Sequence, residues 1–514
     1  MTSQPQGQPK RRRAISARHV VVVGYGMAGA RLAEEIRRRD PAAERVELTV
    51  LGAEPHLAYN RILLSTVVAG SLRPEAVRLH GPDWGPRHRV DLRLGTGATR
   101  IDRARGRVEL TGGGTARYHA VVLATGSRPW IPPTAGLAYP DGRLADGVLQ
   151  FRTIDDCERI IAAAGGGVPV AVLGGGLLGL EAARALVGRG NPVTVVHPMA
   201  HLMERQLDPG AGRVLARVLA GAGLRFRLGR TAARYVPGSG LELDDGSRVE
   251  AGLVLVCAGV RAETWLAREA GLAVRQGITV DDELRTADPS VYAIGDCAQH
   301  PGSVTGQVQP AWDQAAVLAD LLTGTDEKAR YRGTPTVTRL KARGVELAAM
   351  GEVHAGAGPQ GGGPAGGPEG DDPAGEPEVL SLQDPAGGRY AKVVIRGGIV
   401  TGAIMLGLPD AAATATQFFD RGIPAPADRL GLLLGRALPD ERPVTPADLP
   451  ANAVVCQCNT VTKGQLVSAH RAGAGTVGDL VARTRATTGC GSCHVAVQRL
   501  AGWLAGRDGG PGPG

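Results

Sequence analysis

Short apolar runs recur along the chain, and two of them begin the same succession of segments. HVVVVG at 19–24 precedes the amphipathic stretch ARLAEEIRRR, and a second alternating run, ERVELTVLG, follows it. Farther along, VPVAVLGG at 168–175 begins a similar succession. Strand-sized apolar runs separated by helix-sized amphipathic segments are typical of parallel α/β units. The pattern therefore predicts two such units.

The apolar runs also bound the kind of protein. Those around Val20 and Val170 are far shorter than the ~20 residues that a membrane helix needs. A chain of 514 residues is too long for one ordinary core, so we expect several domains. The KRRR cluster at 10–13 lacks the apolar stretch and cleavage site of a signal peptide. We therefore expect a cytoplasmic protein that does not bind membranes, with a disordered basic tail at 1–17.

The pattern changes after residue 330. Residues 331–445 contain two segments of alternating strands, and Gly397 and Gly398 predict a hairpin in the second, so we expect a small α/β interface domain. Residues 355–378 are rich in glycine and proline, cannot bury a core and are predicted to be disordered. A proline-rich link then leads to a separate module at 450–505, and residues 506–514 are predicted to be a second disordered tail.

Charge and cysteine content narrow the choice further. The net charge is +8, and aromatic residues make up 3% of the chain, so the basic, aromatic-interleaved stripe of a nucleic-acid binder is missing. Seven cysteines in a chain of this length do not form a disulfide framework, so paired cysteines are better candidates for metal ligands. Cys157, Cys257 and Cys297 stand alone and are predicted to be packing residues.

Both apolar units carry a glycine motif at the turn from strand to helix. In such a G-x-G-x-x-G turn the first glycine allows the turn, the second lets a pyrophosphate approach the backbone, and the third lets the helix pack on the strand. The glycines are Gly24, Gly26 and Gly29 in the first unit and Gly174, Gly176 and Gly179 in the second. Two motifs in one chain predict two bound dinucleotides.

Two further signals complete a specific order. AVVLATG ends an apolar strand at Thr125 and Gly126, and VYAIGD ends another at Gly295 and Asp296. This order resembles the two-dinucleotide-binding flavoproteins of the pyridine nucleotide-disulfide oxidoreductase fold over residues 18–330. The resemblance implies an α/β fold with two Rossmann-like domains, followed here by the small α/β domain and a small helical [2Fe-2S] domain. It places an FAD-binding domain at 18–145 and 267–330 and an NAD(P)H-binding domain at 146–266.

The resemblance also implies site residues. The helix begun by QPAWDQ would point its positive end at the flavin ring, and Glu181 would be the catalytic carboxylate beside the flavin. FAD would be held by Gly24, Gly26, Gly29, Glu54, Arg61, Thr125, Gly126 and Asp296, and NAD(P)H by Gly174, Gly176, Gly179, Glu181 and His197.

The chain departs from this family at several positions. Disulfide reductases carry two cysteines just after the second strand, but residues 52–80 contain none, so we do not expect a disulfide reductase. The ribose-binding acid of the family would stand at Gly52, which leaves Glu54 as the nearest substitute. The lysine that relatives pair with Glu181 is replaced by Thr66, so the partner of Glu181 is left open.

His197 ends the second strand of the second unit, where NAD-specific units place an acid for the ribose hydroxyl. An imidazole there neither pairs strongly with that hydroxyl nor repels a 2′-phosphate. The alternative is a surface histidine at a strand end. The sequence therefore predicts modest discrimination between NADH and NADPH and leaves the preferred nucleotide open.

Four cysteines at the end of the chain are paired as C-x-C-x31-C-x2-C: Cys456, Cys458, Cys490 and Cys493. The spacing alone suits either a structural zinc ion or an iron–sulfur cluster. The wording, CQCNTVTKGQL and TTGCGSC, resembles the [2Fe-2S] domain of bacterioferritin-associated ferredoxin. That resemblance implies a [2Fe-2S] cluster with these cysteines as its ligands.

The whole arrangement resembles the N-terminal half of the NAD(P)H-dependent nitrite reductase large subunit and the electron-transfer subunit of assimilatory nitrate reductase. Nitrite reductases continue into a sirohaem domain, and this sequence ends at Gly514, so we expect an electron-transfer component for a separate nitrate or nitrite reductase. The alternatives are a ferredoxin or rubredoxin reductase serving an oxygenase, and a flavoprotein whose cysteine module regulates or handles iron. A homodimer is possible for the interface domain.

Overall fold

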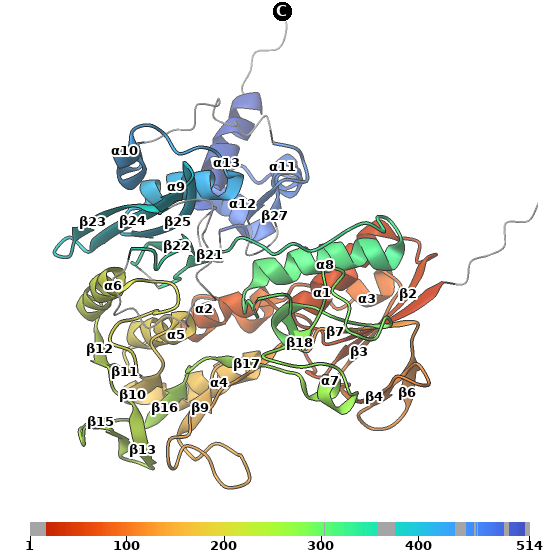
Figure 1. Ribbon diagram of the computed structural model, residues 1–514, viewed down its shortest axis with the longest axis horizontal. Helices are drawn as coiled ribbons and strands as arrows, with labels where there is room; N and C mark the ends of the chain where they lie inside the picture. The colour runs from red at the N-terminus through yellow and green to blue at the C-terminus, as the bar shows by residue number, and fades with distance from the viewer. Residues whose placement is uncertain are drawn as a thin grey trace, which may run out of the picture. The chain divides into compact units, whose positions relative to one another are not determined.

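The computed structural model, shown in Figure 1, divides into two units by its internal contacts. It describes residues 17–302, 304–342, 344–356, 376–436, 449–456, 459, 461–487 and 493–508. Most of the disorder predicted at 1–17 and 355–378 falls outside these residues, and the prediction is wrong at its last position, because Glu378 begins a strand. None of the helices in the described ranges is long and apolar enough to cross a bilayer.

The first unit combines the described part of Met1–Tyr59 with His80–Ser127 and Ala262–Thr334. Its central sheet has the order β19-β7-β1-β2-β3 with all neighbours parallel, because each strand is followed by a crossover. α1 packs against α8. The elements are β1 (Arg18–Val23), α1 (Met27–Arg39), β2 (Val46–Gly52), β3 (Val90–Leu94), β7 (Ala120–Leu123), β19 (Val291–Ala293) and α8 (Val308–Thr323).

Smaller elements complete the first unit. An antiparallel sheet consists of β4 (Ala98–Asp102), β5 (Arg107–Leu110) and β6 (Thr115–Arg117), and the short helices are α3 (Trp84–Arg87) and α7 (Trp265–Glu269). The pair β18 (Ile278–Thr279) and β20 (Ala298–Gln299) is parallel.

The second unit contains a parallel sheet of the order β12-β11-β10-β16-β9. Two inner strands, β10 and β16, are apolar and buried at every position, as buried parallel strands are. The elements are β9 (Val148–Gln150), α4 (Ile154–Ala163), β10 (Val170–Leu173), α5 (Leu177–Gly188), β11 (Val193–His197), α6 (Pro209–Gly221), β12 (Leu224–Leu228) and β16 (Leu253–Val256), with an antiparallel sheet of β13 (Ala232–Val236), β14 (Gly240–Leu243) and β15 (Arg248–Glu250).

Asn60–Leu79 belongs to this second unit, although the sequence placed it inside the FAD-binding domain. Its helix α2 (Leu64–Val68) packs against α4 and α5, which explains the difference. The division by contacts also groups the small interface domain and the cysteine module with the second unit, giving two units where the sequence predicted four domains.

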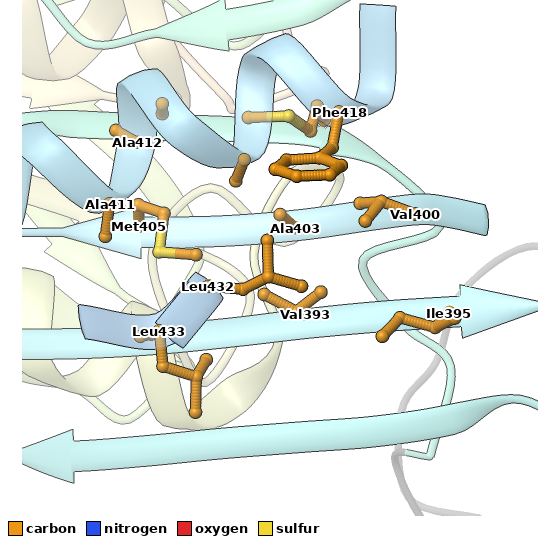
Figure 2. Close-up of a cluster of buried hydrophobic side chains, with 14 residues drawn as sticks. Val393, Ile395, Val400, Ala403, Met405, Ala411, Ala412, Phe418, Leu432 and Leu433 are labelled. Carbon is orange, nitrogen blue, oxygen red and sulfur yellow. The ribbon is translucent and has the colours of Figure 1, made fainter. Parts of the chain in front are cut away.

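A five-stranded antiparallel sheet, β21-β22-β25-β24-β23, lies within residues 331–445, for which the sequence predicted a small α/β domain. The predicted hairpin is confirmed, because Gly397 and Gly398 join β24 to β25 with positive φ values of 53° and 79°. Figure 2 shows α9 laying Phe418 over apolar side chains of these strands. The elements are β21 (Val337–Arg339), β22 (Leu347–Gly351), β23 (Glu378–Asp384), β24 (Arg389–Arg396), β25 (Ile399–Leu406), α9 (Pro409–Arg421) and α10 (Arg429–Leu434).

The cysteine module is small and mostly helical, as predicted. Its elements are β26 (Val454–Cys456), β27 (Val461–Thr462), α11 (Lys463–Arg471), α12 (Val477–Thr484) and α13 (His494–Asp508). The prediction of a disordered tail from 506 is wrong for its first residues, because α13 continues to Asp508. Leu500 and Leu504, one turn apart and buried, pack the end of this helix into the module's core.

Candidate functional sites in the two units

In the first unit the chain turns from β1 into α1 through a glycine loop. Gly24 has a φ of +114°, and a Cβ there would lie 2.2 Å from the carbonyl oxygen of Ala124. A Cβ on Gly29 would lie 1.9 Å from the carbonyl oxygen of Gly24. Gly26 is the N-cap of α1 and provides no side-chain cap, so the first N–H groups of the helix can face a ligand.

The other predicted FAD residues of the first unit meet this loop at one edge of the sheet. Thr125 and Gly126 follow β7, and Asp296 follows β19. Because β1, β7 and β19 are parallel neighbours, their carboxyl ends lie side by side. Ser127 Oγ donates a hydrogen bond of 2.7 Å to Asp296 Oδ2, which fixes the carboxylate. The structure thus brings the sequence-predicted residues together.

Glu54 and Arg61 fall in different units. Glu54 follows β2 in the first unit and accepts a hydrogen bond of 2.6 Å from Tyr59 Oη. Arg61 begins the second unit's first helical turn, and its guanidinium donates to the carbonyl of Arg152 at 3.0 Å. Glu54 lies two residues beyond the end of β2, where the sequence placed the substitute for the ribose-binding acid.

The second glycine loop is built in the same way. Gly174 has a φ of +119°, and a Cβ there would lie 2.3 Å from the carbonyl oxygen of Cys257. A Cβ on Gly179 would lie 2.1 Å from the carbonyl oxygen of Gly174. Gly176, the N-cap of α5, faces open space, with no atom within 4 Å of a Cβ. Two closed positions and one open one match what a bound pyrophosphate requires.

His197 lies at the end of β11, but it does not present its ring to solvent. The residue is 4% exposed. Its Nδ1 accepts a hydrogen bond of 3.1 Å from the N–H of Gly175, and its Nε2 lies 3.0 Å from Glu204 Oε2. The residue at this strand end is a histidine and not an acid, but the structure places the carboxylate of Glu204 beside its ring. Periodicity gave no sign of Glu204, since it lies in a turn seven positions after the strand.

Glu181 has a cation that the sequence did not reveal. The residue is buried on α5, and its Oε2 lies 3.5 Å from the ammonium of Lys341. Its Oε2 also accepts a hydrogen bond of 2.9 Å from Ser65 Oγ, and its Oε1 accepts one of 3.1 Å from the Lys341 N–H. The Lys341 ammonium also donates to the carbonyl of Ile62. Lys341 thus fills the role left open by Thr66.

The cysteine module buries two of its predicted ligands. Cys456 ends β26 and Cys493 precedes α13, and both belong to the module's apolar core. Burial lowers the pKa of Arg485, and a negative charge on the nearby Cys456 sulfur would oppose that shift. Cys458 and Cys490 lie outside the described residues.

The three solitary cysteines are buried, as expected of packing residues. Burial raises the pKa of the Cys157 thiol and of the Cys257 thiol to about 12. Burial also raises the pKa of Cys297. All three are therefore protonated at neutral pH, and none is placed to act as a nucleophile.

Comparison with known proteins agrees with this geometry. Residues 18–315 match the family described as pyridine nucleotide-disulphide oxidoreductase, and residues 454–502 match the BFD-like [2Fe-2S] binding domain. "Nitrite reductase [NAD(P)H]" of Bacillus subtilis (strain 168) is 34% identical over 503 residues, covering 96% of this chain and 58% of the relative. "Assimilatory nitrate reductase electron transfer subunit" of the same strain is 31% identical over 493 residues, covering 95% of this chain and 60% of the relative.

Shorter relatives match the flavoprotein part. "Rubredoxin-NAD(+) reductase" of Alcanivorax borkumensis is 32% identical over 343 residues, covering 66% of this chain and 87% of the relative. A solved structure, the ferredoxin reductase for the CYP199A2 system from Rhodopseudomonas palustris, aligns with a TM-score of 0.68 and 25% identity over 79% of this chain and 95% of that one.

The matched domains settle the class of chemistry. The first domain indicates FAD and NAD(P)H, and the second indicates a [2Fe-2S] cluster, so the alternative of a structural zinc site is not favoured. The protein is an NAD(P)H-dependent flavoprotein oxidoreductase with an iron–sulfur domain. By its two glycine loops, its strand order and its match over residues 18–315, the chain belongs to the pyridine nucleotide-disulphide oxidoreductase family.

Proposed function

We propose that this chain passes electrons from NAD(P)H through FAD and a [2Fe-2S] cluster to a separate nitrate or nitrite reductase. The observation that carries the proposal is the alignment of 95% of this chain with a relative named "Assimilatory nitrate reductase electron transfer subunit". That relative is longer than the aligned part, and so is the nitrite reductase. The acceptor is therefore the part of the proposal that most needs a test.

In the first unit the chain's own residues bind and orient the flavin nucleotide. Gly24, Gly26 and Gly29 let a pyrophosphate approach the N–H groups at the start of α1, whose positive end attracts it. Asp296, fixed by Ser127, accepts hydrogen bonds from hydroxyl groups of the ligand. When bound, FAD accepts two electrons as a hydride and releases them singly, which is the conversion that a one-electron cluster requires.

In the second unit Glu181 is a buried carboxylate that three donors hold in place. Ser65 Oγ, the Lys341 N–H and the Lys341 ammonium all face its two oxygens. A carboxylate that accepts from three donors is held in one position. Gly174, Gly176 and Gly179 would provide the phosphate loop of this unit, and Glu181 lies on α5, the helix that follows this loop.

The cluster module supplies the exit for electrons in this proposal. Cys456, Cys458, Cys490 and Cys493 provide the four thiolates that two irons need. The fold buries Cys456 and Cys493 among apolar side chains, which would limit access of water to a cluster bound there.

The test removes one ligand. Cys456→Ser should abolish the cluster's visible and EPR signals, while NAD(P)H still reduces FAD in stopped-flow measurements. Transfer to a purified nitrate or nitrite reductase should fall at least ~100-fold, the scale of losing an essential redox centre. Cys157→Ala, which removes an equally buried thiol outside the module, is the matched control and should keep all three properties.

Two outcomes would contradict the proposal. If Cys456→Ser in folded protein stopped flavin reduction as well, the order of electron flow would be wrong. If the wild-type protein reduced rubredoxin rapidly and the nitrate and nitrite reductases not at all, the function would be that of the shorter relatives.

A further inference from the structure

The segment after β11 folds back onto the second phosphate loop. The N–H of Met203 donates a hydrogen bond of 3.0 Å to the carbonyl of Gly175, while the N–H of Gly175 donates to His197 Nδ1. A Cβ on Gly175 would lie 2.8 Å from both His197 Cγ and Leu202 Cδ2. Gly175 is therefore held by contacts on both sides, and the second glycine loop, the His197 ring and the segment 198–207 pack together.

The hydrogen bonds fix the state of the histidine. A backbone N–H can only donate, so Nδ1 of His197 must accept and carries no proton. The proton therefore resides on Nε2, which donates to Glu204 Oε2 at 3.0 Å. Because both ring nitrogens are used within the protein, His197 has no group left for a ribose hydroxyl.

Glu204 has a carboxylate oxygen that can accept a hydrogen bond from a ribose hydroxyl. Its side chain is 29% exposed, although one oxygen rests on the imidazole. The hydrogen bond from His197, against the effect of burial, lowers the pKa of this carboxyl, so the group is negatively charged at neutral pH. The ring, which is hydrogen-bonded to Gly175 of the second glycine loop, thus holds a charged, partly exposed carboxylate beside it.

The carboxylate of Glu204 lies near the end of the second strand of a Rossmann unit. In a Rossmann unit an acid at the end of the second strand pairs with the ribose hydroxyl of NADH and repels the 2′-phosphate of NADPH. Here β10, α5 and β11 form that unit, and its second strand ends in His197. We propose that Glu204 is the residue that selects NADH over NADPH in this chain, and that His197 is its positioning residue.

Two arginines near this strand end, Arg230 and Arg205, are the groups that could bind a 2′-phosphate instead. Arg230, whose N–H donates to the His197 carbonyl, forms an ion pair of 2.7 Å with Asp245. Arg205 follows Glu204, is exposed, and its positive charge also contributes to the lowered pKa of the Glu204 carboxyl. The competing outcome is that Arg205 captures a 2′-phosphate and the chain prefers NADPH.

The experiment measures binding directly. Calorimetry on the purified full chain compares ADP-ribose with 2′-phospho-ADP-ribose, two probes that bind without reducing the flavin. The wild-type protein should bind ADP-ribose at least tenfold more tightly, and Glu204→Gln should reduce that ratio by roughly tenfold, equivalent to ~1.4 kcal/mol. Glu250→Gln removes an exposed carboxylate from the same unit and should leave the ratio unchanged.

A double-mutant cycle separates positioning from a direct role. His197→Asn alone should lower the ratio, but in the Glu204→Gln background it should have no further effect on the ratio. Thermal unfolding of each variant confirms that it is folded. Independent effects of the two substitutions would overturn the assigned role of His197.

Each remaining outcome also decides the matter. An unchanged ratio in folded Glu204→Gln, an equal change in Glu250→Gln, or tighter binding of the 2′-phosphate probe by wild type would overturn the proposal. The inference rests only on dinucleotide binding by the second unit and not on the electron acceptor. A failure of both probes to bind would overturn it together with the dinucleotide site, whereas a wrong acceptor would leave it intact.

Discussion

At the scale of single residues, the buried charge of Glu181 depends on a lysine far along the chain. The two side chains are 4% and 10% exposed, and their charged atoms lie 3.5 Å apart. Removing one member of a buried pair leaves the other charge without compensation, which costs more than the pair itself stabilises.

Lys341→Met should therefore lower the free energy of unfolding of the second unit by about 3 kcal/mol or more. The double variant Lys341→Met with Glu181→Gln should recover most of this loss, because an uncharged amide can still accept from Ser65. The urea unfolding midpoints of the single and double variants measure these changes, and Lys328→Met, at an exposed lysine, is the control. An equal loss in the double variant would mean that Lys341 stabilises through packing.

At the scale of elements, the helix α6 is tied to strand β24 through one carboxylate. Asp208 caps α6 by accepting a hydrogen bond of 2.9 Å from the Ala211 N–H. Its other oxygen accepts from Tyr390 Oη at 2.6 Å and from the Lys392 ammonium at 3.0 Å. Burial opposes ionisation, but these hydrogen bonds and the lysine charge outweigh it and lower the pKa of Asp208.

The sign of the resulting pH dependence follows. Because the pKa of Asp208 is lower in the folded state, its contribution is present above the unfolded value of about 3.9 and is lost as the pH falls through the folded value. Asp208→Asn keeps a residue that caps helices well but removes the negative charge beside Lys392. It should therefore lower the free energy of unfolding by about 3 kcal/mol at pH 7 and by less in acid. Urea unfolding from pH 7 down to pH 3 tests this, with exposed Asp410→Asn as control. A constant difference across that range would show that the charge is not responsible.

The same scale explains what the sequence could predict. Each glycine loop depends on residues within a few positions, so Gly24 and Gly174 could be recognised with their strands and helices. Lys341 meets Glu181 across 160 positions, and Glu204 reaches His197 from an irregular turn. Such pairs leave no periodic signal, because only the tertiary fold brings them together.

Both glycine loops share a support that no motif describes. In the first unit Tyr25 Oη bonds to Nδ1 of His80, whose Nε2 lies 2.7 Å from Glu34. In the second unit Gly175 bonds to His197, which is paired with Glu204. A histidine–glutamate pair thus braces a residue of each glycine loop, and the two units repeat this solution with residues from unrelated positions.

At the scale of the whole molecule, the domains predict what the purified protein contains. The chain should carry about one FAD and one [2Fe-2S] cluster, with two irons and two acid-labile sulfides per chain. Anaerobic purification followed by metal, sulfide and flavin analysis measures each. Zinc without iron would contradict the prediction and restore the reading that the cysteine spacing alone left open.

Lys341 lies beyond residue 315, where the match to the flavoprotein family ends. A residue that neutralises a charge inside the dehydrogenase half is therefore encoded in the half that follows it. A gene fusion that cuts this oxidoreductase after the matched segment and joins it to another redox carrier would leave the charge of Glu181 uncompensated. A working graft must carry the stretch through Lys341 with it.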